Sequence, residues 1–71
     1  MPHIDITMIP GRDDKTKQAL ANKVQRFLAE ELQIDPKLVS VSIEDVEKEN
    51  WSQHMNSLKG KRMFVQPEYE K

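Results

Sequence analysis

Two short runs in which apolar and polar residues alternate flank one long amphipathic segment, and this order constrains the fold more than any other feature of the sequence. In the first run, Ile4, Ile6 and Met8 alternate with polar residues, which is the period of a half-buried strand. The second run, residues 39–44, repeats the pattern with a β-branched residue at every other position. The sequence therefore predicts one strand on each side of the central segment.

The central segment has the period of a helix. A Pro-Gly pair at positions 10–11 separates it from the first strand, and either Asp13 or Asp14 can accept a hydrogen bond from the first free backbone N–H groups. We predict a helix from about Asp14 to Leu32, before the Asp-Pro pair at 35–36. Its apolar stripe consists of Leu20, Val24, Phe27, Leu28 and Leu32.

The order strand, helix, strand predicts an α/β (α+β) fold of the β-α-β type in a single domain over residues 1–71. A crossover of this length joins parallel strands, with the helix on one face of the sheet. A chain of 71 residues without cysteine has a thin core, and two strands alone make no stable sheet. We therefore expect a homodimer whose protomers build one four-stranded sheet; a homohexamer of three such dimers is the alternative.

The last third of the chain is less regular. A short helix carrying Trp51 is predicted to begin at Asn50 and to end at Gly60, and residues 63–65 are predicted to form a short strand. The basic cluster in this region consists of Lys59, Lys61 and Arg62. With a net charge of −1, so short a cluster predicts a solvated surface and no nucleic-acid partner.

Composition excludes several other classes of protein. No apolar run is long enough to span a bilayer and no signal peptide is recognisable, so we expect a soluble, cytoplasmic protein with no membrane partner. The absence of cysteine removes thiolate chemistry and cysteine-based zinc sites. His3 and Asp5 share a strand face, but two ligands are too few for a metal. We expect no cofactor and no metal.

The chemistry left to such a chain lies at its start. Proline is small enough for Met1 to be removed, which would leave the secondary amine of Pro2 as a candidate general base. An α-amino group titrates near 7.7–8.0 and a prolyl amine is more basic, so its pKa must be lowered for work at pH 7. Partial burial and a neighbouring cation such as Arg12 both act in that direction.

These residues resemble the 4-oxalocrotonate tautomerase family over the span from Pro2 to Trp51. The resemblance rests on the opening Met-Pro-His-Ile-Asp-Ile, the Gly-Arg pair at 11–12, the amphipathic helix and the Val-Ser-Val-Ser-Ile run at 39–43. It implies an isomerase in which Pro2 moves a proton between the keto and enol forms of a small 2-oxo acid. It also implies that Arg12 binds the substrate carboxylate, that Trp51 forms a pocket wall, and that neighbouring subunits share the site.

One position departs from the family pattern. Ser40 stands where the prototype has a second arginine, so a monocarboxylate of the phenylpyruvate type is favoured over a dicarboxylate of the 2-hydroxymuconate type, with Ser40 as a weaker hydrogen-bonding partner. The Glu-Asn-Trp segment and the Gln-Pro-Glu-Tyr tail resemble a bacterial, dimeric, phenylpyruvate-tautomerase-like subgroup more than they resemble the hexameric prototype of the family.

Other interpretations of the same residues stay open. The fold also suits hydration or dehalogenation, in which a protonated Pro2 acts as an acid and Glu49 activates water. A different class of function is a non-catalytic oligomeric binding module with a blocked N-terminus. Taken without the family pattern, Arg12 could also be a solvated turn residue.

Overall fold

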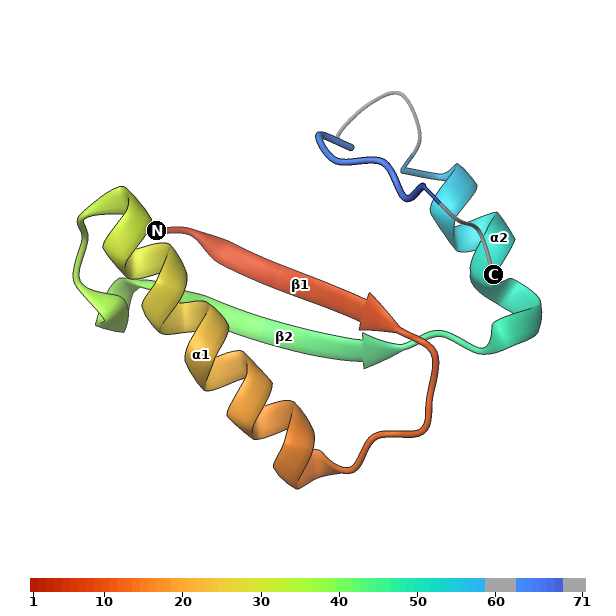
Figure 1. The fold of residues 1–71 in the computed structure, drawn as a ribbon, viewed down its shortest axis with the longest axis horizontal. Coiled ribbons are helices and arrows are strands. Elements are labelled where there is room, and N and C mark those ends of the chain that lie inside the picture. Colours follow the sequence, from red (N-terminus) through yellow and green to blue (C-terminus); the bar gives the residue numbers. More distant parts are fainter. Residues whose placement is uncertain (59–62, 69–71) are drawn as a thin grey trace.

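The chain folds as a β-α-β unit followed by a short helix (Figure 1). The computed structural model describes residues 1–58 and 63–68. The elements in chain order are β1 (His3–Met8), α1 (Asp14–Leu32), a 3-10 turn η1 (Pro36–Leu38), β2 (Ser40–Asp45) and α2 (Lys48–Asn56). The predicted fold class is confirmed, and the three predicted elements of the β-α-β unit lie within about one residue of their expected bounds.

The two strands are parallel, and their register places His3 opposite Ser40 and Ile6 opposite Ile43. Because side chains alternate between the faces of a sheet, this register collects the apolar residues of both strands on one face. The other face, here called the polar face, carries His3, Asp5, Thr7, Ser40, Ser42 and Glu44. Within the described residues this sheet has two strands, so each strand leaves one edge without a partner.

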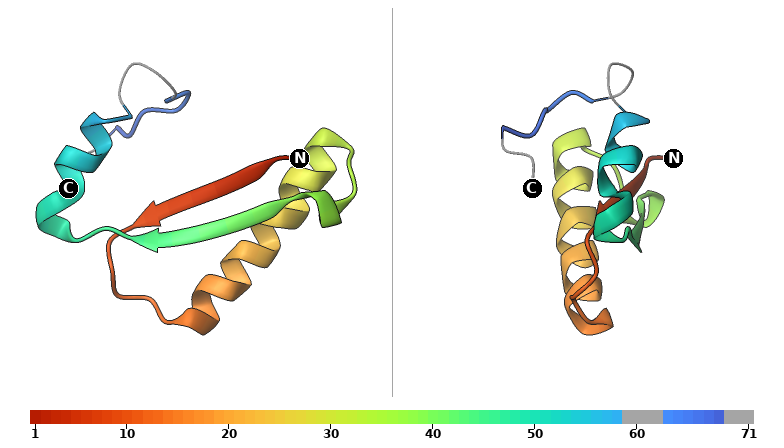
Figure 2. Two further views of the ribbon diagram at one scale, coloured as in Figure 1. Left: turned by 180° about the vertical axis from the view of Figure 1, so that it is seen from behind. Right: turned by 90° about the vertical axis from the view of Figure 1, so that its right-hand side faces the viewer.

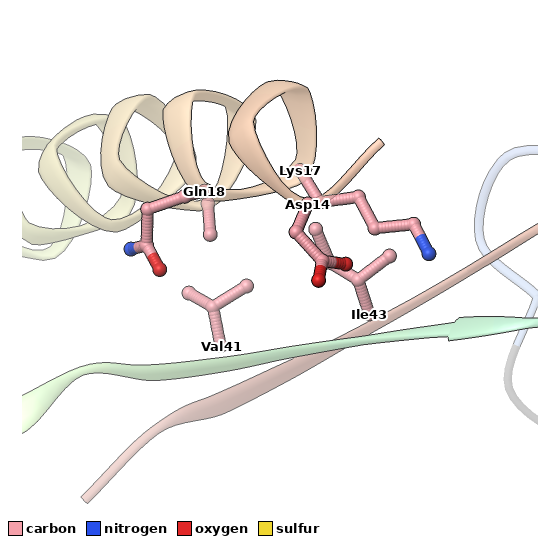
Figure 3. A pocket seen from close by; sticks show the side chains of 6 residues that line it. Asp14, Lys17, Gln18, Val41 and Ile43 are labelled. Atoms are coloured by element: carbon pink, nitrogen blue, oxygen red, sulfur yellow. The ribbon is translucent and has the colours of Figure 1, made fainter. Parts of the chain in front are cut away.

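Helix α1 covers the apolar face. It lies in front of the strands in Figure 1 and behind them when the molecule is seen from the opposite side in Figure 2. Val41 and Ile43 point from β2 toward this helix (Figure 3). An ion pair of 2.9 Å between Lys17 Nζ and Asp45 Oδ2 joins the first turns of α1 to the end of β2. The polar face is thereby left on the side away from α1.

Local hydrogen bonds set the ends of α1. The carboxylate of Asp13, rather than that of Asp14, accepts the backbone N–H of Thr16 at 2.8 Å and caps the helix. At the other end Gln33 adopts the left-handed conformation, with φ 56°, and its N–H bonds back to the last turn. The predicted bounds of this helix, Asp14 to Leu32, are confirmed.

The interior of the protomer is thin. Among the described residues, Ala29 and Val39 are the hydrophobic side chains that count as buried, with 3% and 5% of their surface exposed. The predicted apolar stripe is only partly covered, because Phe27 is 66% and Leu32 is 52% exposed. The helix therefore presents an apolar flank that a two-stranded sheet is too narrow to cover.

The prediction for the last third of the chain was partly wrong. Helix α2 begins at Lys48 and Asn50 lies inside its first turn, where its N–H already bonds the carbonyl of Glu47 at 2.9 Å, so Asn50 is not the cap. Residues 63–65 form no strand, and the sheet of the described residues consists of β1 and β2. The predicted helix end at Gly60 and the basic residues Lys59, Lys61 and Arg62 lie outside the described residues. The described helices include none that is long and apolar enough to cross a membrane.

Candidate active site

Two of the four predicted site residues lie together, at the end of the sheet where both strands begin. Pro2 directly precedes β1 and is half-buried. The backbone N–H of Ser40, the first residue of β2, donates a hydrogen bond of 3.2 Å to the carbonyl of Pro2. This bond extends the strand pairing by one step, so Pro2 is held against the start of the second strand through its carbonyl.

The other two predicted residues lie at the opposite end. Arg12 is exposed in the loop that connects β1 to α1. Trp51 is half-buried on α2, which follows the end of β2 and lies beyond the strand ends, away from the N-terminus (Figure 1). A strand of 6 residues is about 20 Å long, so one protomer does not bring Arg12 and Trp51 to Pro2.

The polar face carries a continuous chain of hydrogen bonds that starts at Ser40. The hydroxyl of Ser40 lies 2.6 Å from Nδ1 of His3, and Nε2 of His3 lies 2.9 Å from the hydroxyl of Ser42. Ser42 in turn donates to Oδ1 of Asp5 at 2.7 Å. The predicted juxtaposition of His3 and Asp5 on one face is therefore confirmed, with Ser42 between them.

Asp5 and Glu44 form a carboxyl pair further along this face. The hydrogen bond from Ser42 and a second one from Glu44 lower the pKa of Asp5. The pKa of Glu44 is raised, because its carboxyl shares a hydrogen bond with Asp5 and is repelled by the charge of Asp5. His54 on α2 lies near enough for its charge to favour the ionised form of both carboxyls.

Helix α2 contributes an aromatic cluster of two rings. The centroids of Trp51 and His54 are 6.4 Å apart and the rings are tilted by 41°. Both side chains are half-buried. The apolar ring of Trp51 and the imidazole of His54 therefore lie together at the end of the sheet where the strands finish.

The open hollow between α1 and the sheet is separate from these groups (Figure 3). It is lined by Asp14, Lys17, Gln18, Ala21, Val41 and Ile43. None of the four predicted site residues lines it. Among the described residues no group of three or more histidine and acidic side chains is placed to hold a metal.

Sequence reasoning missed the role of Ser42 and the ring contacts of His3. The alternation of polar residues along both strands already placed them on one face, but it did not say which residues stand opposite each other. The parallel register of His3 with Ser40 supplies that information. With the register known, the residues that bond both nitrogens of the imidazole are neighbours along β2.

A small β-α-β unit with a proline before its first strand fits the family that the sequence resembles, and comparison with known proteins identifies that family. A family model described as tautomerase enzyme matches residues 1–54, which include Pro2, Arg12, Ser40 and Trp51. The chain belongs to the 4-oxalocrotonate tautomerase family and is an enzyme with tautomerase activity.

The relatives cover most of this chain. A probable tautomerase of Xylella fastidiosa is 33% identical over 73 residues, which span 97% of this chain and 89% of the relative. The 2-hydroxymuconate tautomerase of Comamonas testosteroni is 43% identical over 51 residues, or 72% of this chain and 81% of the relative. A probable tautomerase of Halalkalibacterium halodurans is 31% identical over 51 residues, or 72% and 84% of the two chains.

Proposed function

We propose that this tautomerase interconverts the keto and enol forms of a 2-oxo acid, with the amine of Pro2 as general base after removal of Met1. The observation that carries the proposal is the attachment of Pro2 to the start of β2. Its carbonyl accepts the N–H of Ser40 at 3.2 Å, which holds the residue half-buried at the end of the sheet. An amine fixed in this way does not have to be ordered again for each turnover.

The proton transfer needs no other reactant. The neutral amine of Pro2 takes a proton from the carbon beside the ketone, and the electron pair of that C–H bond forms the C=C bond of an enolate. The prolinium then returns the proton to the enolate oxygen, which gives the enol, and the reverse sequence gives the ketone. Pro2 ends in its original protonation state in both directions.

A second subunit is needed to complete this site. Pro2 and Arg12 lie at opposite ends of the strands, whereas the edge strands that meet across a two-fold axis perpendicular to a sheet run antiparallel. The Arg12 end of one protomer then lies beside the Pro2 end of the other. We therefore propose a homodimer with a four-stranded sheet, with a homohexamer of such dimers as the alternative.

In this assembly Arg12 of one subunit holds the substrate carboxylate and Trp51 covers its apolar part. A guanidinium binds a carboxylate through two parallel hydrogen bonds, which orient the substrate as well as attract it. The indole lowers the polarity around the amine, and this favours the neutral form that acts as a base. Within one protomer, Arg12 and Trp51 both follow the ends of the strands. Both roles therefore require this end of the sheet to lie beside the Pro2 end of the neighbouring subunit.

Ser40 favours a substrate with one carboxylate. A neutral hydroxyl gives a weaker hydrogen bond to an anion than a guanidinium does, so a phenylpyruvate-like acid suits this site better than a dicarboxylate. The relative named 2-hydroxymuconate tautomerase makes 2-hydroxymuconate the second substrate to assay.

The test is an intact mass of the natively expressed protein followed by an ultraviolet assay of phenylpyruvate ketonisation. We expect loss of Met1, and we expect Pro2→Ala to lower kcat by at least about a hundredfold, which is the contribution of a positioned general base. Retained Met1 together with turnover, or unchanged turnover in Pro2→Ala, would contradict the proposal. A Pro2 pKa well above 8, read from the pH dependence of turnover, would instead favour the acid role of a hydratase or dehalogenase.

A further inference from the structure

The imidazole of His3 is bonded at both ring nitrogens, and the two bonds lead to different places. Nδ1 faces the hydroxyl of Ser40 at 2.6 Å, beside Pro2. Nε2 faces the hydroxyl of Ser42 at 2.9 Å, and that hydroxyl donates to Asp5 at 2.7 Å. The chain of bonds therefore runs from an ionised carboxylate to the one serine that the proposed function places at the substrate.

Counting protons fixes the direction of every bond in this chain. An ionised carboxylate only accepts hydrogen bonds, so the single hydroxyl proton of Ser42 is committed to Asp5. Ser42 must then accept from His3, which requires the proton of a neutral imidazole to be on Nε2. Nδ1 is left as an acceptor and takes the hydroxyl proton of Ser40. Toward a substrate, Ser40 then offers lone pairs only.

Protonation of His3 reverses the last bond. An imidazolium donates from both nitrogens, so Nδ1–H donates to Ser40 and the hydroxyl proton of Ser40 becomes free. Ser40 can then donate to a ketone or carboxylate oxygen. We propose that His3 is a positioning residue of the tautomerase site, which determines whether Ser40 donates a hydrogen bond to the substrate or accepts one from it. The inference rests on the proposed function, because it needs Ser40 to face the substrate.

The two states of His3 suit different forms of the substrate. With a neutral ring, Ser40 accepts a hydrogen bond and therefore suits the hydroxyl of an enol. With a charged ring, Ser40 donates one and suits the ketone oxygen, and the positive charge attracts an anionic acid. Protonation of His3 should therefore shift the preference of the site from the enol toward the keto acid.

Other charged groups face the same ring and enter the pH dependence. β1 contributes Asp5, and the residue before β1 contributes the amine of Pro2 after removal of Met1. β2 contributes Glu44 further along the polar face, and α2 contributes His54, whose charge acts on Asp5 and Glu44. Variants must therefore separate His3 from the amine and from His54.

The first test reads the tautomer and needs no turnover. In the wild-type protein above pH 8, ¹⁵N spectra of the labelled imidazole are expected to place the proton of His3 on Nε2. Ser42→Ala removes the acceptor that selects this tautomer, so the preference is expected to disappear, whereas Thr7→Ala, on the same face, leaves it unchanged. A proton on Nδ1 in the wild type, or an unchanged spectrum in Ser42→Ala, would overturn the inference.

The second test measures binding without chemistry. In the Pro2→Ala background, calorimetry with phenylpyruvate held as the keto acid is expected to give about tenfold tighter binding at pH 5.5 than at pH 8, since Ser40 becomes a donor beside a charged ring. Adding His3→Gln should remove most of this difference in affinity between pH 5.5 and pH 8, and adding His54→Gln should leave it unchanged. The N-terminal amine is the same in all three variants.

The two proposals fail in different ways. A difference in affinity that survives His3→Gln, or that is lost in His54→Gln, overturns the role of His3 while the activity of the wild-type enzyme stands. Turnover that survives Pro2→Ala overturns the general base, whatever the spectra and the binding data show. Loss of binding in His3→Gln at both pH values, with a folded protein by circular dichroism, would also contradict a role limited to the hydrogen-bond direction of Ser40.

Discussion

The two ends of the sheet carry different kinds of chemistry. Where the strands begin, Pro2 and Ser40 are held by backbone pairing, and His3 completes a set of hydrogen bonds on the polar face. Where the strands end, the exposed Arg12 and the half-buried Trp51 come from a loop and a helix. In the proposed function the first end supplies the base together with small hydroxyls, whereas the second supplies a cation and an aromatic ring.

Under the proposed function, this difference makes a single protomer an incomplete enzyme. A general base needs a substrate held against it, and the residues suited to hold an anionic substrate lie a strand length away. An antiparallel neighbour brings the second end of one chain to the first end of another, and the unpaired edges of β1 and β2 allow such a neighbour.

Among the substitutions that test this difference between the two ends, replacement of Arg12 is expected to change the kinetics most. Arg12→Ala should lower kcat/KM for phenylpyruvate about a hundredfold, mainly through a higher KM, because a bidentate bond to the carboxylate is lost. Arg12→Lys should recover only part of this loss, since an ammonium forms no such paired bonds. Arg26→Ala, which removes an exposed arginine of α1, is the matched control and should leave steady-state kinetics unchanged.

Mixed dimers of two inactive variants test whether Pro2 of one subunit and Arg12 of the other form one site. When Pro2→Ala and Arg12→Ala chains are unfolded and refolded together in equal amounts, half of the dimers are mixed and each mixed dimer has one complete site. Activity should return to about a quarter of the wild-type value. Pro2→Ala mixed with the Pro2→Ala/Arg12→Ala double variant should stay inactive. No recovery, despite mixed dimers in native mass spectra, would place both residues in one protomer's site.

A smaller effect is expected at the helix start that follows Arg12. The bond from the backbone N–H of Thr16 lowers the pKa of Asp13, so this carboxylate stabilises the fold above its unfolded pKa of about 3.9 and less as the pH falls below it. Asp13→Ala should lower the temperature of unfolding at pH 7 by roughly a few degrees, and the difference should shrink near pH 3. Asp14→Ala, one residue further on, should lower the temperature of unfolding by less than Asp13→Ala does.

The smallest effect is expected from Glu44. Its pKa is raised by Asp5, so its ionised form is disfavoured in the folded protein, and this cost is present at neutral pH and absent at low pH. Glu44→Gln should therefore give a small rise in the temperature of unfolding at pH 7 and none near pH 3.5. Glu30→Gln on the exposed side of α1 serves as the control. A lower temperature of unfolding of Glu44→Gln at pH 7 would mean that the ionised Glu44 stabilises the fold.

The β-α-β unit could be predicted because its signals are local. Alternation marked both strands, and the cap at Asp13 with the break at residues 35–36 marked the helix. The start of α2 was missed because Glu47 precedes it without a side-chain cap, so the sequence has no signal there. The strand predicted at residues 63–65 failed for another reason: these residues are three consecutive apolar residues, and a short apolar run becomes a strand only where a partner strand pairs with it.

The candidate site was predicted by residue but not by arrangement. The resemblance proposes Pro2, Arg12 and a site shared between subunits, but the separation of the two residues within one protomer follows from the length of β1. In the same way, the hydroxyls around His3 were visible as alternate residues of the second strand. Their contact with the imidazole depends on a register set by the whole crossover, which no short pattern encodes.

The thin interior has a consequence for how much of the protein a cell must contain. Ala29 and Val39 are the hydrophobic side chains buried in the described protomer, and Phe27 stays 66% exposed. If assembly supplies the missing burial, unfolding follows mass action, and dilution lowers both the fraction folded and the fraction active. Such an enzyme has a threshold concentration, below which its specific activity falls together with its melting temperature.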